Sequence, residues 1–260
     1  MSKDQAQRLS STGRSANDDY RLAVGYGSAW HLLRCLGWQR ARFTSRIAAE
    51  VGATQITWLD FIGYTGNQSY PSGMPIRDGE WKRIDFITDA HVQQAYNEFW
   101  PTRGEQQNWD AVGKAVIAGT EEWLLVEAKA HPAEIRANGT DAKETGGRPT
   151  IRSAFVKTLQ ALGHDDDAAP AQAEQWLKGH YQHANRVATL HFLTKHGIQA
   201  RLIFLYFCGD RHPDDKFCPA NPEEWKPTLQ KIDENLGLKR TSTLEQRVHN
   251  VFVNVDLPIQ

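Results

Sequence analysis

Trp123-Leu-Leu-Val-Glu-Ala-Lys-Ala130 is the most informative stretch of this 260-residue chain. It opens with four apolar residues, as expected for a buried strand, and two opposite charges follow at Glu127 and Lys129. Because strand side chains alternate between two faces, Glu127 and Lys129 project to one side and Ala128 to the other. Charged groups on a buried strand are costly unless they are paired or bind a metal. The stretch therefore predicts an ionic site at the end of a buried strand.

A second carboxylate, Asp110, stands 17 residues before Glu127. The segments 109–117 and 123–130 are predicted to be two strands joined by a turn at 119–120, and antiparallel pairing would bring the two carboxylates close together. Two carboxylates and a backbone carbonyl suit a hard cation such as Mg²⁺. A lysine beside them can hold a water molecule, favour its deprotonation and neutralise charge on a phosphate. These are the parts that phosphodiester hydrolysis requires.

The arrangement Asp110 … Glu127-Ala128-Lys129 resembles the PD-(D/E)XK nuclease superfamily, which has the restriction-endonuclease-like fold. The resemblance implies that Asp110 and Glu127 bind the metal, that the carbonyl of Ala128 assists, and that Lys129 orients the attacking water. It implies Mg²⁺ as the cofactor, with Mn²⁺ as a substitute, and nucleic acid as the substrate, with DNA favoured. Trp109 stands where the family pattern has a proline.

The resemblance also implies a core of a helix, a three-strand meander, a helix and a further strand. We expect the last two to be the helix from about Thr150 and the strand 201–207. Strands alternating with helices predict an α/β protein with a restriction-endonuclease-like core, in which a mixed β-sheet is flanked by helices. Other helices are expected at 28–36, 39–51, 90–100, 171–196 (broken near 179) and 222–236, and other strands at 56–62, 83–87 and 249–255.

Two further sets of residues are candidates for the same site. Many members of the superfamily carry an acidic residue on the first core helix, and both Glu98 and Glu50 are candidates for that role. On the expected helix 171–196, Gln182 and Arg186 stand four residues apart and share one face. That face either lies beside the metal site, where it would hold a phosphate or order the lysine, or is an ordinary solvated face.

The chain is expected to form one folded unit. Residues 1–19 are polar, rich in serine and without periodicity, so they predict a flexible tail. Residues 20–260 are expected to be a single α/β domain whose motif core covers about 90–207. The segment 63–80 is rich in Gly, Asn, Ser and Pro and predicts a long loop.

Composition narrows the class of protein. The formal net charge of −1 disfavours a protein that coats DNA, but not a nuclease whose positive charge lines one cleft. Three cysteines and no apolar leader favour a reducing cytoplasm over a disulfide framework. No apolar run reaches the ~18–20 residues that cross a bilayer, so no membrane partner is expected. The spacing of Cys208, His212 and Cys218 fits no common zinc pattern.

Two alternatives to a nuclease follow from the same residues. An E-x-K triplet is also common as a solvated ion pair, in which case Asp110 is unrelated to it. A protein of the same fold could instead be catalytically inactive and bind nucleic acid or a protein partner. The intact set of Asp110, Glu127 and Lys129 disfavours such a binding module, because two like charges close together are costly and an inactive site does not need them. A homodimer is left open.

Overall fold

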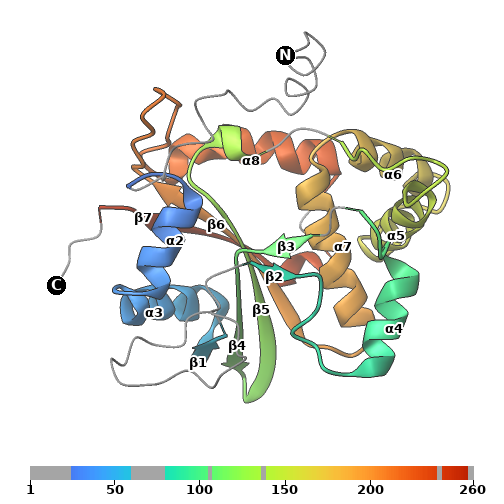
Figure 1. Cartoon of the computed structure of the whole chain (residues 1–260), viewed down its shortest axis with the longest axis horizontal. Coiled ribbons are helices and arrows are strands. Elements are labelled where there is room, and N and C mark those ends of the chain that lie inside the picture. The colour runs from blue at the N-terminus through green and yellow to red at the C-terminus, as the bar shows by residue number, and fades with distance from the viewer. Residues whose placement is uncertain (1–24, 60–79, 105–106, 136–138, 239–241, 257–260) are drawn as a thin grey trace, which may run out of the picture.

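The computed structural model describes residues 25–59, 80–104, 107–135, 139–238 and 242–256. At the centre of these residues is a five-stranded mixed sheet with the strand order β1-β4-β5-β6-β7 (Figure 1). Its strands are β1 (Ala53–Trp58), β4 (Ala111–Ile117), β5 (Thr120–Lys129), β6 (Ala200–Cys208) and β7 (Val248–Asn254). A separate two-stranded ribbon pairs β2 (Trp81–Lys82) with β3 (Asn108–Trp109).

The sheet combines a meander with a parallel half. β1, β4 and β5 pair antiparallel in sequence order, whereas β5 pairs parallel with β6 and β6 parallel with β7. The β4–β5 turn consists of Ala118 and Gly119, which both have positive φ (50° and 80°), as the favoured two-residue hairpin turns require. A parallel pair needs a long crossover. The helices between β5 and β6 supply it.

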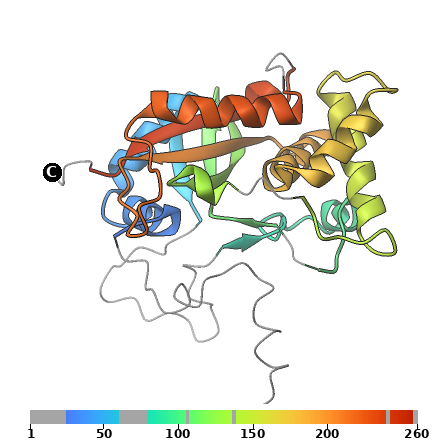
Figure 2. The same ribbon diagram turned by 90° about the horizontal axis from the view of Figure 1, so that it is seen from above.

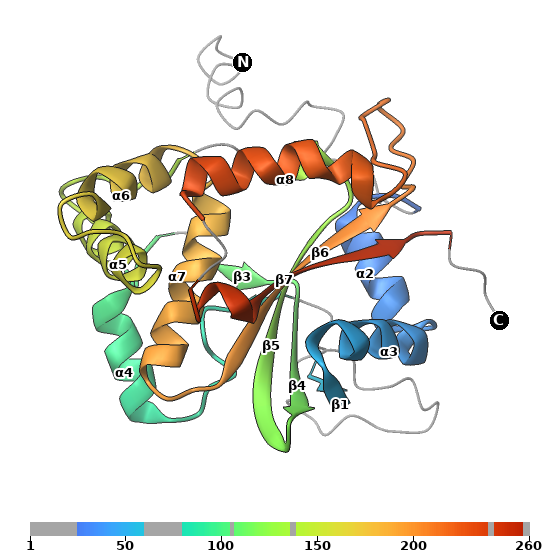
Figure 3. The same ribbon diagram turned by 180° about the vertical axis from the view of Figure 1, so that it is seen from behind.

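Helices cover both faces of the sheet. The helices α2 (Ser28–Leu36) and α3 (Arg40–Val51) pack on the face that carries Leu124, Val126 and Ala128 of β5. The other face is covered by α4 (Ala90–Phe99), α5 (Arg148–Ala161), α6 (Ala169–Lys178), α7 (Tyr181–Lys195) and α8 (Pro222–Leu236). Figure 2 shows α8 and α2 on opposite sides of β6, and Figure 3 shows α4–α7 gathered on one side of the sheet centre, with α2 and α3 on the other. The 3₁₀ turn η2 (Pro132–Glu134) follows β5, and the 3₁₀ turn η3 (Glu245–Arg247) directly precedes β7.

The expected mixed α/β architecture is confirmed, and several boundaries agree with their local signals. The long helix expected at 171–196 is divided into α6 and α7 at Gly179. Gly52, in a left-handed conformation, ends α3, and the side chain of Asp89 caps α4 by accepting from two backbone amides. The expected helix 222–236 coincides with α8.

The strand expected at 83–87 is wrong. β2 ends at Lys82, Arg83 has a positive φ of 49°, and a turn follows. The amide of Ile87 donates to the carbonyl of Ile84 at 2.8 Å, and the side chain of Gln93 donates to both of those residues' carbonyls. Ile84, Phe86 and Ile87 all point into the core instead of alternating between two faces. The segment therefore has the apolar composition of a strand without its geometry. The expected tail 1–19, the loop at 63–79 and the strand end at 60–62 lie outside the described residues.

The helix next to the sheet also differs from expectation. The helix from about Thr150 exists as α5, but it packs on α4, α6 and α7, whereas α7 packs directly on β6. The two extra helices in this crossover explain the difference, since α5 and α6 form an outer layer and α7 alone leads into β6.

Candidate ionic site between two strands and a helix

Asp110 lies where the chain leaves the small ribbon and enters the main sheet. Trp109 immediately before it is fully buried and donates its indole N–H to the carbonyl of Arg83 at 2.7 Å, which anchors the ribbon. The Asp110 amide donates to the carbonyl of Val126 at 3.0 Å. Its carboxylate Oδ2 accepts from the amide of Ala128 at 2.6 Å. The structure thus brings Asp110 to the backbone between Glu127 and Lys129.

Glu127 is the buried centre of the cluster, with a side chain that is almost fully covered. Its Oε1 accepts from Lys129 Nζ at 2.6 Å, and its Oε2 accepts from Arg186 Nε at 2.9 Å. Burial by itself would raise the pKa of Glu127, but the charges and hydrogen bonds of Arg186 and Lys129 outweigh it and lower the pKa to about 2. Glu127 is therefore ionised over the whole physiological range.

Arg186 connects α7 to both sheets, and only 3% of its surface is exposed. Besides Glu127, its guanidinium donates to the side chain of Asn185 at 2.8 Å and to the carbonyl of Asn108. The same group lies over the ring of Trp109, 4.9 Å from the ring centroid. A planar guanidinium with five donors suits such a junction better than a lysine would. The polar face that the sequence predicted for this helix is thus buried at Arg186 rather than solvated.

The carboxyl group of Asp110 differs from that of Glu127 in its titration. Burial, followed by repulsion from the Glu127 carboxylate, raises the pKa of Asp110 to about 7, against the opposing effects of Lys129 and the Ala128 amide. The residue is half-buried, and within the described ranges no hydrogen bond reaches its Oδ1. Asp110 is therefore the member of the cluster with an acceptor atom to spare.

His183 is a neighbour of the cluster that the sequence reasoning missed. Its ring stacks on Phe204, with 4.5 Å between centroids, and neither ring nitrogen has a hydrogen-bond partner in the described residues. Burial lowers its pKa to about 3, although Glu127 acts in the opposite direction, so the ring is neutral at physiological pH. Its position three residues before Arg186 on a helix is the signal that would have placed it on the same side.

The other residues considered from the sequence lie elsewhere. Gln182 is half-buried one turn before Arg186. Glu98 is exposed on α4, and Glu50 pairs with Arg46 at 3.3 Å on the exposed side of α3. No ion pair or hydrogen bond among the described residues joins either glutamate to Asp110 or Glu127, so the structure brings neither into the cluster.

In the described part of the chain, no group of three or more His, Cys, Asp or Glu side chains, Cys208, His212 and Cys218 included, is arranged to hold a metal ion. Cys208 is buried, and burial raises its pKa to about 11.

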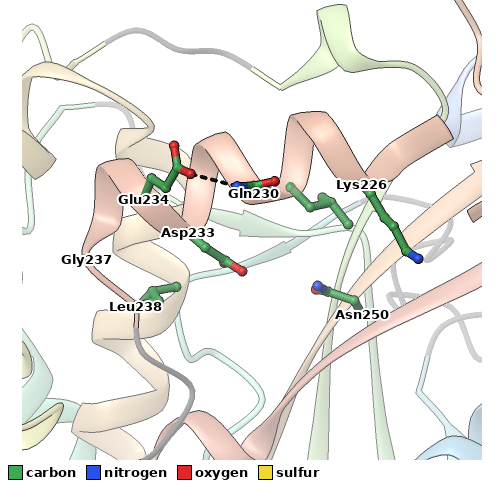
Figure 4. Close-up of a pocket in the computed structure, with 8 residues that line it drawn as sticks. Lys226, Gln230, Asp233, Glu234, Gly237, Leu238 and Asn250 are labelled. Atoms are coloured by element: carbon green, nitrogen blue, oxygen red, sulfur yellow. Dashed lines mark hydrogen bonds between the residues drawn. The ribbon is translucent and has the colours of Figure 1, made fainter. Parts of the chain in front are cut away.

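An open hollow of about 640 Å³ lies between α8 and β7, apart from the ionic cluster (Figure 4). Its wall includes Lys226, Asp233 and Asn250, and Gln230 donates to Glu234 at 2.9 Å along α8. None of the residues of the ionic cluster lines it, so it does not form part of the candidate site.

Comparison of the chain with protein-family models, with curated proteins and with solved structures found no match. In the described residues, no helix has both the length and the apolar character needed to cross a membrane. Fold and site together define a mixed α/β protein with a largely buried Asp–Glu–Lys–Arg cluster at the carboxyl end of its central strand, β5.

Proposed function

We propose that this protein is a Mg²⁺-dependent phosphodiesterase with a restriction-endonuclease-like core, acting on nucleic acid, with DNA as the substrate to test first. The observation that carries the proposal is the contact of the Asp110 carboxylate with the Ala128 amide, at 2.6 Å, between Glu127 and Lys129. An ordinary surface E-x-K pair would be solvated, whereas Glu127 and Lys129 are both buried and a second carboxylate meets them.

The order of elements supports the same proposal. α3 precedes the antiparallel meander β1-β4-β5, and α7 then leads into β6, which pairs parallel with β5. This order is consistent with the helix, three-strand meander, helix and strand that the resemblance implies, and it supports the proposal. The elements that depart from it are additions between these parts, namely the β2–β3 ribbon, α4, and the outer helices α5 and α6.

In this proposal a hard cation would be held at the Asp110 side of the cluster. Asp110 Oδ1 accepts no hydrogen bond from the described residues, and the Ala128 carbonyl is directed to the same side as the Ala128 amide, because both groups of a strand residue face one neighbour. Glu127 is shared between Lys129 and Arg186, so the cluster is close to charge balance without a cation. We therefore expect weak Mg²⁺ binding that strengthens when a substrate phosphate adds negative charge. When bound, the ion supplies positive charge at the phosphate and makes water more acidic.

Each protein group then has a distinct task. Lys129 is held by Glu127 at 2.6 Å, with its ammonium next to the carboxylate pair, so it can donate to the attacking water and keep it in position. Arg186 holds Glu127 in one orientation from the other side and is a positioning residue. The pKa of Asp110 is raised to about 7, so its carboxylate can bind the ion once the group is deprotonated.

The test is cleavage of labelled linear, circular and single-stranded DNA with Mg²⁺ or Mn²⁺. Lys129→Ala is expected to lower the rate by about a hundredfold or more, because it removes positive charge at the phosphate. Asp110→Asn is expected to lower it by a similar factor, because it weakens the hold on the cation that supplies such charge. Lys114→Ala is the matched control, since Lys114 is a half-buried lysine on the neighbouring strand β4 that pairs with the exposed Glu121 at 2.6 Å. The proposal fails if folded protein cuts none of the three substrates and calorimetry detects no metal binding.

A catalytically inactive nucleic-acid-binding module is the second candidate. The occupation of both Glu127 oxygens by Lys129 and Arg186 favours it, because a carboxylate that is fully engaged by cations has less need of a metal. Nucleic-acid binding that is unchanged by chelator and by Asp110→Asn, without cleavage, would identify the module.

A further inference from the structure

Trp38 is the most exposed large apolar side chain in the described residues, with 94% of its surface accessible. It lies in the short connection between α2 and α3, at the edge of the molecule away from α4–α7 (Figure 1). By contrast, Trp100, Trp109, Trp176 and Trp225 are buried. Leaving a tryptophan in water forgoes the stabilisation that burial of such a large ring brings. Such a side chain is available for contact with a partner.

The backbone fixes Trp38 in its exposed position. The amide of Gly37 donates to the carbonyl of Leu33 at 2.9 Å, and the amide of Gln39 donates to the carbonyl of Arg34 at 3.1 Å. Phe43 and Ile47 of α3 are buried against the sheet on the same side as α2. The turn is therefore closed by its own hydrogen bonds and by the packing of both helices, and it presents the indole outward without using it for folding.

The helical pair around Trp38 is strongly basic compared with the rest of the chain. Residues 28–51 contain four arginines and one carboxylate, Glu50, whereas the whole chain has a formal charge of −1. Arg42 and Arg46 are exposed on α3, and Arg46 forms a partly exposed pair with Glu50 at 3.3 Å. Leu33 adds a 40% exposed apolar side chain on α2. An exposed indole among arginines is the combination that stacks on bases and neutralises phosphates.

We propose that the α2–α3 hairpin binds single-stranded nucleic acid, with Trp38 stacked on an unpaired base and Arg42 and Arg46 contacting phosphates. The choice of nucleic acid over other anionic partners rests on the proposed function of the Asp110 cluster, but binding at the hairpin requires neither metal nor cleavage. The stacked partner is single-stranded because a base within a duplex does not offer its face to a side chain.

The hairpin is tied to the strand that carries the candidate site. The amide of Ser28, at the start of α2, donates to Glu134 Oε1 at 3.1 Å, and the other oxygen of Glu134 accepts from Ala130 at 2.7 Å. Asp210, at the end of β6, accepts from the amide of Gly27 at 3.0 Å. α2 then extends nine residues, about 13.5 Å, from this anchor to the Trp38 turn. Hydrogen bonds thus connect the start of the hairpin to the strand ends beside the candidate site.

The test is fluorescence anisotropy of a labelled single-stranded oligonucleotide with the full chain in EDTA. Trp38→Ala and Trp38→Leu are both expected to weaken binding about 5- to 150-fold, while Trp38→Phe, which keeps a π-face, retains most of the affinity. Phe217→Ala, at another exposed aromatic residue, is the control and leaves the affinity unchanged. Equal binding by Trp38→Leu and wild type would overturn stacking.

The charge contribution is tested by salt dependence. Arg42→Gln with Arg46→Gln is expected to reduce the slope of log affinity against log salt by about 1.4, the value for two phosphate contacts on a single strand. Lys226→Gln with Lys231→Gln removes the same charge from exposed positions on α8 and leaves the slope unchanged. Equal effects of the two pairs would overturn the assignment of phosphate contacts to the hairpin.

Other partners give distinct results. Trp38-dependent binding to anionic lipid vesicles, with none to the oligonucleotide, would overturn the proposal in favour of a membrane surface. A wild-type dimer that Trp38→Ala converts to monomer, again without oligonucleotide binding, would identify a second copy as the partner. Trp38-dependent binding without cleavage would leave the hairpin proposal intact and count only against the nuclease. If the protein cleaves DNA and Trp38→Ala changes neither cleavage nor oligonucleotide affinity, the nuclease proposal stands and the hairpin proposal is overturned.

Discussion

Replacing Arg186 by methionine is the sharpest test of how the cluster is held. The change keeps an unbranched apolar stem but removes the guanidinium, so Lys129 is left as the only cation of the buried Glu127. Removing one partner of a buried ion pair typically costs about 3–5 kcal/mol. The pKa of Glu127 gives a similar magnitude. Lowering it from 4.5 to about 2 corresponds to about 3 kcal/mol at neutral pH, which Arg186 and Lys129 contribute together after the opposing effect of burial.

The sign of the pH dependence follows from the depressed pKa. The stability that an ionised Glu127 contributes is fully present above its unfolded pKa of 4.5 and is lost as the pH falls toward about 2. Without Arg186, burial dominates and the carboxyl takes up a proton more easily. The difference in unfolding free energy between wild type and Arg186→Met is therefore expected to be about 3–5 kcal/mol at pH 7 and to shrink between pH 5 and pH 2.

Urea unfolding followed by circular dichroism over this pH range measures the difference. Arg46→Met is the control, because Arg46 pairs with Glu50 on an exposed helix surface, where such pairs contribute about 0–1 kcal/mol. The reasoning is refuted if Arg186→Met costs less than about 1 kcal/mol at pH 7, or if its cost is the same at pH 7 and pH 3. Either result would mean that Glu127 does not depend on Arg186 for its charge.

Two further predictions concern the neighbours of Glu127. Asp110→Asn should stabilise the protein by about 1–3 kcal/mol at pH 8, where the wild type must ionise a carboxyl whose pKa is raised to about 7. The gain should diminish toward pH 5, where wild-type Asp110 holds its proton, and urea unfolding at the two pH values that shows no gain at pH 8 would contradict it. His183→Phe should be neutral or stabilising by about 1 kcal/mol in thermal unfolding, because it replaces two unpartnered ring nitrogens with a ring that can still stack on Phe204. A loss above about 2 kcal/mol would show instead that a ring nitrogen of His183 has a partner in solution.

The sequence by itself determined whatever depends on short-range periodicity and on local backbone preference. Alternation along one strand placed Glu127 and Lys129 on the same face, and both point to the side covered by α7. Gly179 and Gly52 marked helix ends, and Asp89 marked a helix start, because capping involves only a few neighbouring residues.

Only the tertiary structure decided which distant groups meet. Arg186 reaches Glu127 across 59 residues of sequence, and nothing local separates a helix face that meets a carboxylate from one that meets water. The same limit explains the strand expected at 83–87, where buried apolar side chains serve a turn rather than an alternating face. It also explains why the sequence could not choose between Glu98 and Glu50 as the further acidic residue of the site. Both lie on the surface of the folded chain. The exposure of Trp38 likewise follows from helix packing that only the folded chain defines.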